Sequence, residues 1–210
     1  MKNPNLRLLA IAGPPALGLP GLVDACLAAE AGGVTAVQLR AKDATAARLL
    51  DLTEALCAAL TIPVYINDRA DIALAGGAHG VHVGSEDLSP SAVRDLTGDA
   101  LQIGVSVGTE EEATRALKEA VDYWSIGSIY ATGTKLDAGD PIGTVGFKAL
   151  AGRAPRGMTV MAIGGITAAN AAEIMGAGAD GVAVSHGVFG AADVERAARA
   201  IRAAIEEATT

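Results

Sequence analysis

The chain alternates short apolar strand patterns with helical patterns along its whole length, and this alternation constrains the fold most strongly. Eight strand–helix units can be read in the 210 residues. Because strands that alternate with helices over short connections form a parallel sheet covered by helices, we expect an α/β fold. Eight units in a row predict a single (β/α)8 barrel, a TIM barrel, over residues 1–210. Strands are predicted at 6–12, 34–39, 63–66, 80–83, 101–105, 122–126, 159–163 and 181–184, and helices at 22–31, 45–60, 70–76, from Ser89, from Thr109, from Gly146, at 167–175 and at 192–204.

A doubly wound open sheet is the alternative architecture. It would more often show fewer units and a glycine-rich dinucleotide turn after the first strand. Here Gly13, Pro14 and Pro15 follow that strand and lack this spacing. In the later loop, Gly127 and Gly133 are one residue too far apart for a phosphate-binding P-loop.

Composition excludes several classes of protein. Hydrophobic residues make up 50% of the chain but aromatic residues only 3%, so the core must consist of small aliphatic side chains, as in a buried parallel sheet. The net charge of −8 disfavours non-specific nucleic-acid binding, which needs a basic surface. No apolar run reaches the length of about 18 residues that a membrane span needs, and no signal-peptide pattern is visible, so we expect a cytoplasmic protein. Cys26 and Cys57 lie in apolar helical stretches and are expected to be buried free thiols.

Polar residues follow the apolar strands at the ends that meet on one face of a parallel barrel. After strand 2, alternation places Gln38, Arg40 and Lys42 on one side, while Leu39 and Ala41 face the helices. An arginine can hold a phosphate with two parallel hydrogen bonds, and a lysine adds a point charge. Solvent-facing cations are also common at strand ends. The two cations therefore point to an anionic substrate only together with the residues of the neighbouring strands.

Two carboxylates follow the next two strands. Asp68 comes after strand 3 and Asp87 after strand 4, so adjacent strands would bring them together. Carboxylates without a nearby histidine or cysteine favour a hard cation such as Mg2+, which also binds substrate phosphate oxygens. Asp68 could instead cap the following helix. The cations at Arg40 and Lys42 favour the metal interpretation, since carboxylates and cations together suit a magnesium diphosphate.

The loops after the last two strands carry small residues. Gly164 and Gly165 follow strand 7, and Ser185 follows strand 8. Barrels often bind a substrate phosphate at these two loops through backbone N–H groups. A tight turn that needs positive φ, without any ligand, is the alternative explanation for the glycine pair.

Three further residues have more than one interpretation. Ser106 ends strand 5 without partners for a hydrolase triad, so a ligand-binding hydroxyl is favoured over a nucleophile. Lys135 could form a Schiff base, but a phosphate clamp is easier to arrange on its glycine-rich loop. His82 on strand 4 either lines the pocket or serves as a hydrogen-bonded structural residue, which is the favoured interpretation.

Five segments of the chain together resemble the thiamine-phosphate synthase family. They occur in the family's order and spacing and cover 33–42, 66–71, 80–88, 132–135 and 163–166. The resemblance implies an α/β barrel that joins 4-amino-2-methyl-5-hydroxymethylpyrimidine diphosphate to 4-methyl-5-(2-phosphooxyethyl)thiazole. It further implies thiamine phosphate and pyrophosphate as products and a requirement for Mg2+.

The resemblance also implies roles for individual residues. The diphosphate substrate would be held by Gln38, Leu39, Arg40, Ala41, Lys42 and Asn67, and the metal by Asp68 and Asp87. Ser106 and Lys135 would contact the diphosphate side, so that the catalytic group is Arg40, Lys42, Ser106 and Lys135. The thiazole would meet Thr132, Gly133 and Thr134, and its phosphate would meet Gly165, Val184 and Ser185.

The sequence departs from the family pattern at four places, which are Gly13-Pro14-Pro15, Ser85, Gly108 and Ala131. The first alternative function is that of the related thiazole tautomerases, which use a histidine in the strand 5 loop for proton transfer. Gly108 leaves this loop without a histidine, which argues against that function. The second alternative is a non-catalytic sensor of phosphate ligands, which would not need a metal–diphosphate site. The expected partners are small-molecule substrates, with no nucleic acid and no membrane; assembly as a homo-oligomer is left open.

Overall fold

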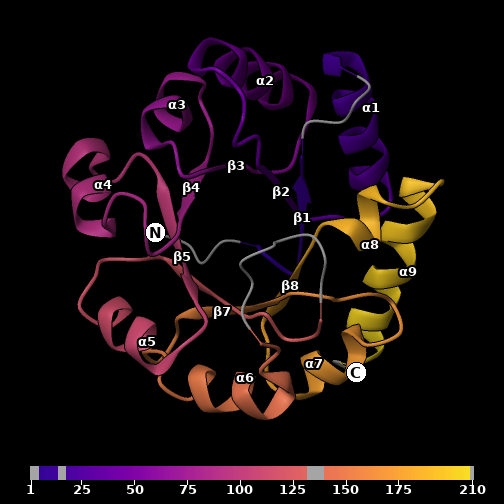
Figure 1. Ribbon diagram of the computed structural model, residues 1–210. Coiled ribbons are helices and arrows are strands. Elements are labelled where there is room, and N and C mark those ends of the chain that lie inside the picture. Colours follow the sequence, from indigo (N-terminus) through magenta and orange to yellow (C-terminus); the bar gives the residue numbers. More distant parts are fainter. Residues whose placement is uncertain (1–4, 14–17, 132–139, 209–210) are drawn as a thin grey trace.

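Eight parallel strands close into a barrel in the computed structural model, which describes residues 5–13, 18–131 and 140–208. Each strand pairs with the next one along the chain, and β8 pairs with β1. The helices form a ring outside the strands (Figure 1). The predicted (β/α)8 barrel is thereby confirmed. The strands are β1 Leu8–Ala12, β2 Ala36–Leu39, β3 Val64–Asn67, β4 Gly80–Val83, β5 Gln102–Val107, β6 Tyr123–Ile126, β7 Thr159–Ile163 and β8 Gly181–Val184.

The helices follow the strands in the order that the alternation predicts. They are α1 Gly18–Ala31, α2 Ala46–Ala59, α3 Ala70–Ala75, α4 Pro90–Thr97, α5 Glu110–Ala116, α6 Gly143–Ala151, α7 Ala171–Gly176, α8 His186–Phe189 and α9 Val194–Glu207. Side chains at several helix starts accept hydrogen bonds from the first turn: Ser89 accepts from Ala92, and Thr109 forms a capping box with Glu112. These caps fix where the helices begin, because the first N–H groups of a helix have no partner within it.

The barrel has two apolar cores because successive strand residues point to opposite faces. On β2, Val37 and Leu39 pack outward against the helices, while Ala36 points inward. Ala41, just after β2, also joins the outer core, as predicted. The inner core consists of Leu6, Leu9, Ile11, Ala36, Tyr65, Tyr123, Met161 and Ala183.

Two tyrosines fill much of the barrel interior. The rings of Tyr65 and Tyr123 lie edge to face, with centroids 5.8 Å apart, and both side chains are fully buried. Gly104 on β5 makes room for Tyr123, because a Cβ atom there would lie 1.9 Å from the ring. Two of the six aromatic residues of the chain thus fill the interior, and the other four pack in or against the outer core.

Some boundaries differ from the predicted ones. α1 begins at Gly18 rather than at residue 22, because Pro20 is tolerated in a first turn, where its missing N–H has no helical partner. α7 begins at Ala171 rather than at 167, since the side chain of Asn170 accepts from Thr167 N–H and holds a turn ahead of the helix. β5 continues to Val107, so Ser106 lies one residue before its end. The short helix α8 was not predicted.

Two further expectations concern the helices and the thiols. Within the part of the chain that the structure describes, no helix is long and apolar enough to cross a membrane. Cys26 and Cys57 are free cysteines, as predicted; Cys26 is buried and Cys57 half-buried.

Candidate active site

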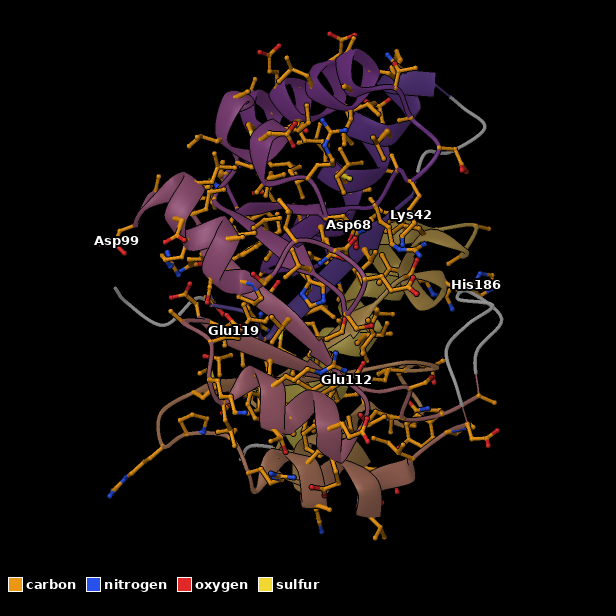
Figure 2. All side chains as sticks on the ribbon, turned by 60° about the vertical axis from the view of Figure 1, so that its left-hand side comes forward. Lys42, Asp68, Asp99, Glu112, Glu119 and His186 are labelled. Atoms are coloured by element: carbon orange, nitrogen blue, oxygen red, sulfur yellow. The ribbon has the colours of Figure 1, made fainter. Side chains whose placement is uncertain are left out.

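Cationic and acidic residues meet at the carboxyl ends of β2, β3 and β4. Lys42 follows β2 and Asp68 follows β3, and the lysine Nζ lies 3.5 Å from the aspartate Oδ2. Figure 2 shows the two side chains reaching toward each other. Arg40 precedes Lys42 by two residues, and its backbone N–H donates to the Ala12 carbonyl at the end of β1. The structure therefore brings Lys42 together with Asp68, one of the predicted metal ligands, and places the Arg40 backbone beside the end of β1.

Asp68 does not cap helix α3. Arg69 occupies the position before the helix, and no side chain there accepts a capping hydrogen bond. Asp68 itself has a positive φ of 66°, which is uncommon for any residue except glycine, and its N–H donates to the His82 carbonyl at 2.8 Å. The main chain thus turns sharply at the end of β3 and directs the carboxylate toward Lys42.

The second carboxylate lies beside the first. Asp87 Oδ2 accepts a hydrogen bond of 2.8 Å from Gly84 N–H, which ties it to the end of β4. Burial raises the pKa of Asp68, and hydrogen bonding and repulsion from Asp87 raise it further, while Lys42 opposes the rise. A carboxylate whose pKa is raised by burial and by a second carboxylate beside it forms a place where a bound cation would be stabilising.

The two carboxylates suit a metal that takes only part of its ligands from protein. Among the described residues, no group of three or more histidine, cysteine, aspartate or glutamate side chains could hold a metal ion. Mg2+ commonly uses one or two carboxylates and completes its shell with water and substrate phosphates. Asp68 and Asp87 therefore fit Mg2+ and do not resemble a complete protein cage.

A row of polar side chains crosses the inside of the barrel next to this cluster. His82 Nε2 lies 3.0 Å from Ser106 Oγ, and His82 Nδ1 lies 3.2 Å from the Tyr123 hydroxyl. Gln38 from β2 hydrogen-bonds to the same hydroxyl. His82 is therefore a buried, hydrogen-bonded residue, as the favoured interpretation predicted, and it also contacts Ser106, one of the predicted site residues. Tyr123 was missed; its place on an inward-facing strand position was the available signal.

The loops after β7 and β8 lie beside each other around the barrel. Gly164 and Gly165 have φ values of 102° and 64°, so the tight turn that the sequence suggested is present. A Cβ atom on Gly165 would lie 2.7 Å from the Ala131 carbonyl oxygen. Ser185 directly follows β8, and Val184 packs its side chain into the outer core, so only its backbone is available to a ligand.

Asn170 holds the loop after β7 and was not singled out from the sequence. Its side-chain Nδ2 donates to the Gly165 carbonyl at 3.0 Å, and its Oδ1 accepts from Thr167 N–H at 2.7 Å. The amide thus clamps both ends of the turn. Its position seven residues beyond the predicted strand end gave no pattern by which to recognise it.

The structure places the remaining predicted residues only in part. Asn67 ends β3 opposite His82 in the strand register. Thr132, Gly133, Thr134 and Lys135 lie outside the described residues. Of the four departures from the family pattern, Gly108 donates its N–H to Glu112, next to the capping box of α5.

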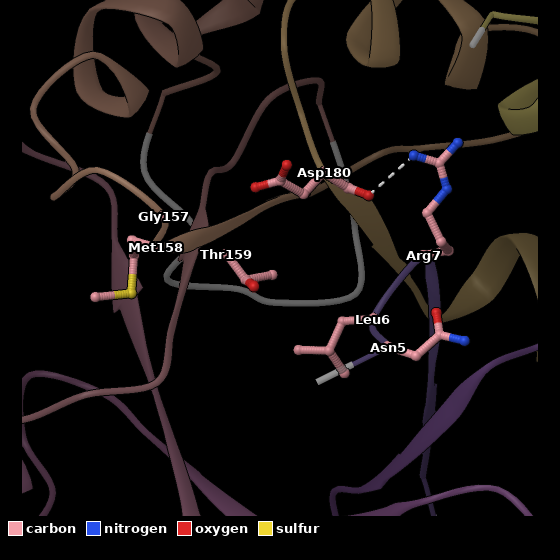
Figure 3. Close-up of a pocket in the computed structure, with 7 residues that line it drawn as sticks. All are labelled: Asn5, Leu6, Arg7, Gly157, Met158, Thr159 and Asp180. Carbon is pink, nitrogen blue, oxygen red and sulfur yellow. Dashed lines mark hydrogen bonds between the residues drawn. The ribbon is translucent and has the colours of Figure 1, made fainter. Parts of the chain in front are cut away.

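A hollow of about 360 Å3 lies at the opposite end of the barrel, where β1, β7 and β8 begin. Figure 3 shows Arg7 donating to the Asp180 carbonyl across it, at 3.3 Å. Its lining contains none of the predicted site residues. Since catalytic residues of such barrels lie at the carboxyl ends of the strands, this hollow is not a candidate active site.

The protein is a (β/α)8 barrel whose mouth carries cations after β2 and carboxylates after β3 and β4. Comparison with known proteins identifies its family more closely. The family model described as thiamine monophosphate synthase matches residues 10–188. The chain belongs to this family.

Individual relatives agree with this assignment. The chain is 46% identical over 183 residues to a thiamine-phosphate synthase of Moorella thermoacetica, a match that covers 86% of each chain. It is 41% identical over 204 residues to one from Xanthobacter autotrophicus, covering 96% of each. Among solved structures, a thiamine phosphate pyrophosphorylase from Pyrococcus furiosus superposes with a TM-score of 0.87, at 32% identity and 99% coverage of both chains.

Proposed function

We propose that this protein is a thiamine-phosphate synthase. It transfers the pyrimidinylmethyl group of 4-amino-2-methyl-5-hydroxymethylpyrimidine diphosphate to the nitrogen of 4-methyl-5-(2-phosphooxyethyl)thiazole and releases pyrophosphate. Membership of the family and the names of the relatives support this activity. The observation that carries it is the cluster at the barrel mouth, where Lys42 lies 3.5 Å from Asp68 and Asp87 adjoins it.

Asp68 and Asp87 would hold Mg2+ together with the diphosphate of the substrate. The ion would neutralise negative charge on the departing pyrophosphate. Through this ion, the two carboxylates would orient the diphosphate end of the substrate at the ends of β3 and β4. Lys42 balances part of their charge, so the site remains suited to an anion as well as to a cation.

The remaining charged groups stabilise the leaving group. Arg40 binds diphosphate oxygens with its planar guanidinium, and Lys42 and Ser106 donate further hydrogen bonds. Lys135 joins them in this proposal. Among the described residues, the histidine beside these donors is His82, and both of its ring nitrogens already lie within hydrogen-bond distance of Ser106 and Tyr123, so it does not stand out as a general base. This favours an ionising substitution: the C–O bond to the diphosphate breaks first, and the thiazole nitrogen then attacks the stabilised pyrimidinylmethyl cation. The backbone of the Gly165 and Ser185 loops holds the phosphate of the thiazole substrate.

The tautomerase alternative is less well supported. Such an activity needs an acid–base residue in the loop after β5, where Gly108 and Thr109 instead bind the carboxylate of Glu112. The sensor alternative is also less well supported, because a protein that only binds phosphate ligands does not need the cluster of Lys42, Asp68 and Asp87.

One experiment separates the three functions. The protein is incubated with Mg2+ and with each substrate alone or both together, and products are identified by mass spectrometry. A synthase forms thiamine phosphate only from both substrates. A tautomerase would exchange thiazole protons for deuterium in D2O without the pyrimidine, and a sensor would bind ligands without any turnover.

A further inference from the structure

Four polar side chains form a continuous row of hydrogen bonds inside the barrel. They come from four different strands: Gln38 from β2, Tyr123 from β6, His82 from β4 and Ser106 from β5. Gln38 bonds to the Tyr123 hydroxyl, this hydroxyl lies 3.2 Å from His82 Nδ1, and His82 Nε2 lies 3.0 Å from Ser106 Oγ. Of these four residues, His82 is the one that contacts both Tyr123 and Ser106. A change in the hydrogen bonding of Tyr123 is therefore passed to Ser106 through His82.

The row runs from the buried interior to the open mouth. Tyr123, Gln38 and His82 are 0%, 3% and 8% exposed, whereas Ser106 is exposed. Ser106 is also the member of this row that the proposed function places against the diphosphate. A buried row of polar groups that ends on one exposed hydroxyl can fix the direction in which that hydroxyl donates its proton.

The donors and acceptors can be assigned from the chemistry of each group. Burial raises the pKa of Tyr123 well above its ordinary value, so the phenol keeps its proton. The phenol oxygen accepts from the Gln38 amide, which leaves its single proton for His82 Nδ1. A neutral histidine that accepts at Nδ1 carries its proton at Nε2, and that N–H then donates to Ser106 Oγ. The Ser106 proton is left to point away from His82, into the mouth.

We propose that Tyr123 is a positioning residue, which holds His82 in the tautomer protonated at Nε2 so that the Ser106 hydroxyl donates to the substrate diphosphate. The proposal rests on the proposed function for the identity of the anion. Without the tyrosine hydroxyl, His82 can carry its proton on Nδ1. Its Nε2 then accepts from Ser106, and the serine proton turns inward, away from the leaving group.

The barrel supplies a matched control in its other buried tyrosine. Tyr65 packs against Tyr123, but its hydroxyl donates to Gln102 Oε1 at the first residue of β5, toward the opposite end of the barrel. Tyr65→Phe and Tyr123→Phe each remove one buried hydroxyl from the same core, and only the second one interrupts the row to Ser106.

The kinetic test uses a double-mutant cycle with Ser106. Tyr123→Phe is expected to lower kcat by about tenfold, the effect of losing one hydrogen bond, with a smaller change in KM for the pyrimidine diphosphate. The effect falls on kcat because charge on the diphosphate oxygens grows in the transition state. Tyr65→Phe should leave kcat unchanged. In a Ser106→Ala background, Tyr123→Phe should cost little more, since the hydroxyl it orients is gone.

The tautomer of His82 gives a second readout that does not depend on activity. The chain has three histidines, so 15N-labelled imidazole spectra can be assigned with His79→Gln and His186→Gln variants. In the unaltered protein, His82 should show a bare Nδ1 and a protonated Nε2; Tyr123→Phe should shift protonation toward Nδ1, and Tyr65→Phe should not. Melting temperatures of the two tyrosine variants show whether they are folded alike.

Three results would overturn the proposal: an equal loss of kcat in Tyr65→Phe, an undiminished effect of Tyr123→Phe without Ser106, or an unchanged His82 tautomer in Tyr123→Phe. Failure of the proposed function is a separate result. If the unaltered protein made no thiamine phosphate, the synthase assignment would fall, while the imidazole spectra would still decide whether Tyr123 sets the His82 tautomer.

Discussion

The ammonium group of Lys42 and the carboxylate of Asp68 lie 3.5 Å apart, although they follow different strands of the barrel. Their side chains are 50% and 23% exposed. A pair this open to water contributes only about 0–1 kcal/mol to stability. Its arrangement is therefore more informative about ligand binding than about folding, because it places a cation beside a carboxylate at the mouth.

The carboxylate of Asp68 should be needed for metal-dependent turnover. Asp68→Asn keeps the size of the side chain, and asparagine tolerates the positive φ of this position. We expect kcat to fall by about 10²–10³-fold, as when one preorganised electrostatic element is lost. The melting temperature without metal should be unchanged or higher, because burial and Asp87 already disfavour the charged form.

The matched control for this prediction is Asp71→Asn. Asp71 lies three residues further along and binds the exposed guanidinium of Arg69. Magnesium titrations of both variants by steady-state kinetics give the comparison. Equal activity of Asp68→Asn and the unaltered protein at every Mg2+ concentration would remove Asp68 from the metal site.

The two anion sites should be separable by mutation. Arg40→Ala removes the proposed clamp on the diphosphate and should raise KM for the pyrimidine substrate more than KM for the thiazole phosphate. Gly165→Ala should do the reverse, because a Cβ atom would approach the Ala131 carbonyl to 2.7 Å and the φ of 64° disfavours alanine. Kinetics with each substrate varied in turn provide the measurement. Equal damage to both substrates by both changes would indicate one shared anion pocket.

The strand order and the side on which each residue lies followed from the sequence, because alternation and strand ends have direct patterns. Gln38 and Lys42 were placed toward the interior and the mouth, and Leu39 and Ala41 in the outer core, by period-two alternation alone. The partners of these residues could not be obtained in the same way. Which hydroxyl meets His82 depends on the registers of β4 and β6 with β5, which lies between them, and the clamp by Asn170 depends on the path of one loop.

Asn170 should preserve the loop that is proposed to bind the thiazole phosphate. Asn170→Asp keeps the oxygen that accepts from Thr167 and loses the amide that donates to the Gly165 carbonyl. We expect KM for the thiazole phosphate to rise severalfold and KM for the pyrimidine diphosphate to change little, whereas Asn170→Ala, which loses both bonds, should have a larger effect. If substrate titrations showed a larger rise of KM for the thiazole phosphate in Asn170→Asp than in Asn170→Ala, the clamp would be contradicted.

Alkaline pH should destabilise the protein partly through Cys26. Burial raises the pKa of this thiol from 9.0 to about 12. A group whose pKa is raised by folding stabilises the protein below its unfolded pKa, and this contribution is lost as the pH rises toward the folded value. The melting temperature should therefore decline between pH 9 and about pH 12. Cys26→Ala should decline less steeply over that window in thermal scans; identical slopes would assign the alkaline loss to other groups.

The proposed ionising mechanism can be tested with altered substrates. Electron-withdrawing substituents on the pyrimidine destabilise the developing cation, so they should lower the single-turnover rate steeply. The same analogues should bind with nearly unchanged affinity, since the diphosphate contacts are the same. A rate that does not respond to the substituents would support direct displacement by the thiazole nitrogen.

The most direct test of the whole account is the stoichiometry of the reaction. Pyrophosphate and thiamine phosphate are measured together in one incubation with both substrates and Mg2+, and again with one component omitted at a time. The account predicts one pyrophosphate for each thiamine phosphate, and neither product when a substrate or Mg2+ is missing. Pyrophosphate released at the full rate without the thiazole phosphate, or no thiamine phosphate in the complete mixture, would contradict it.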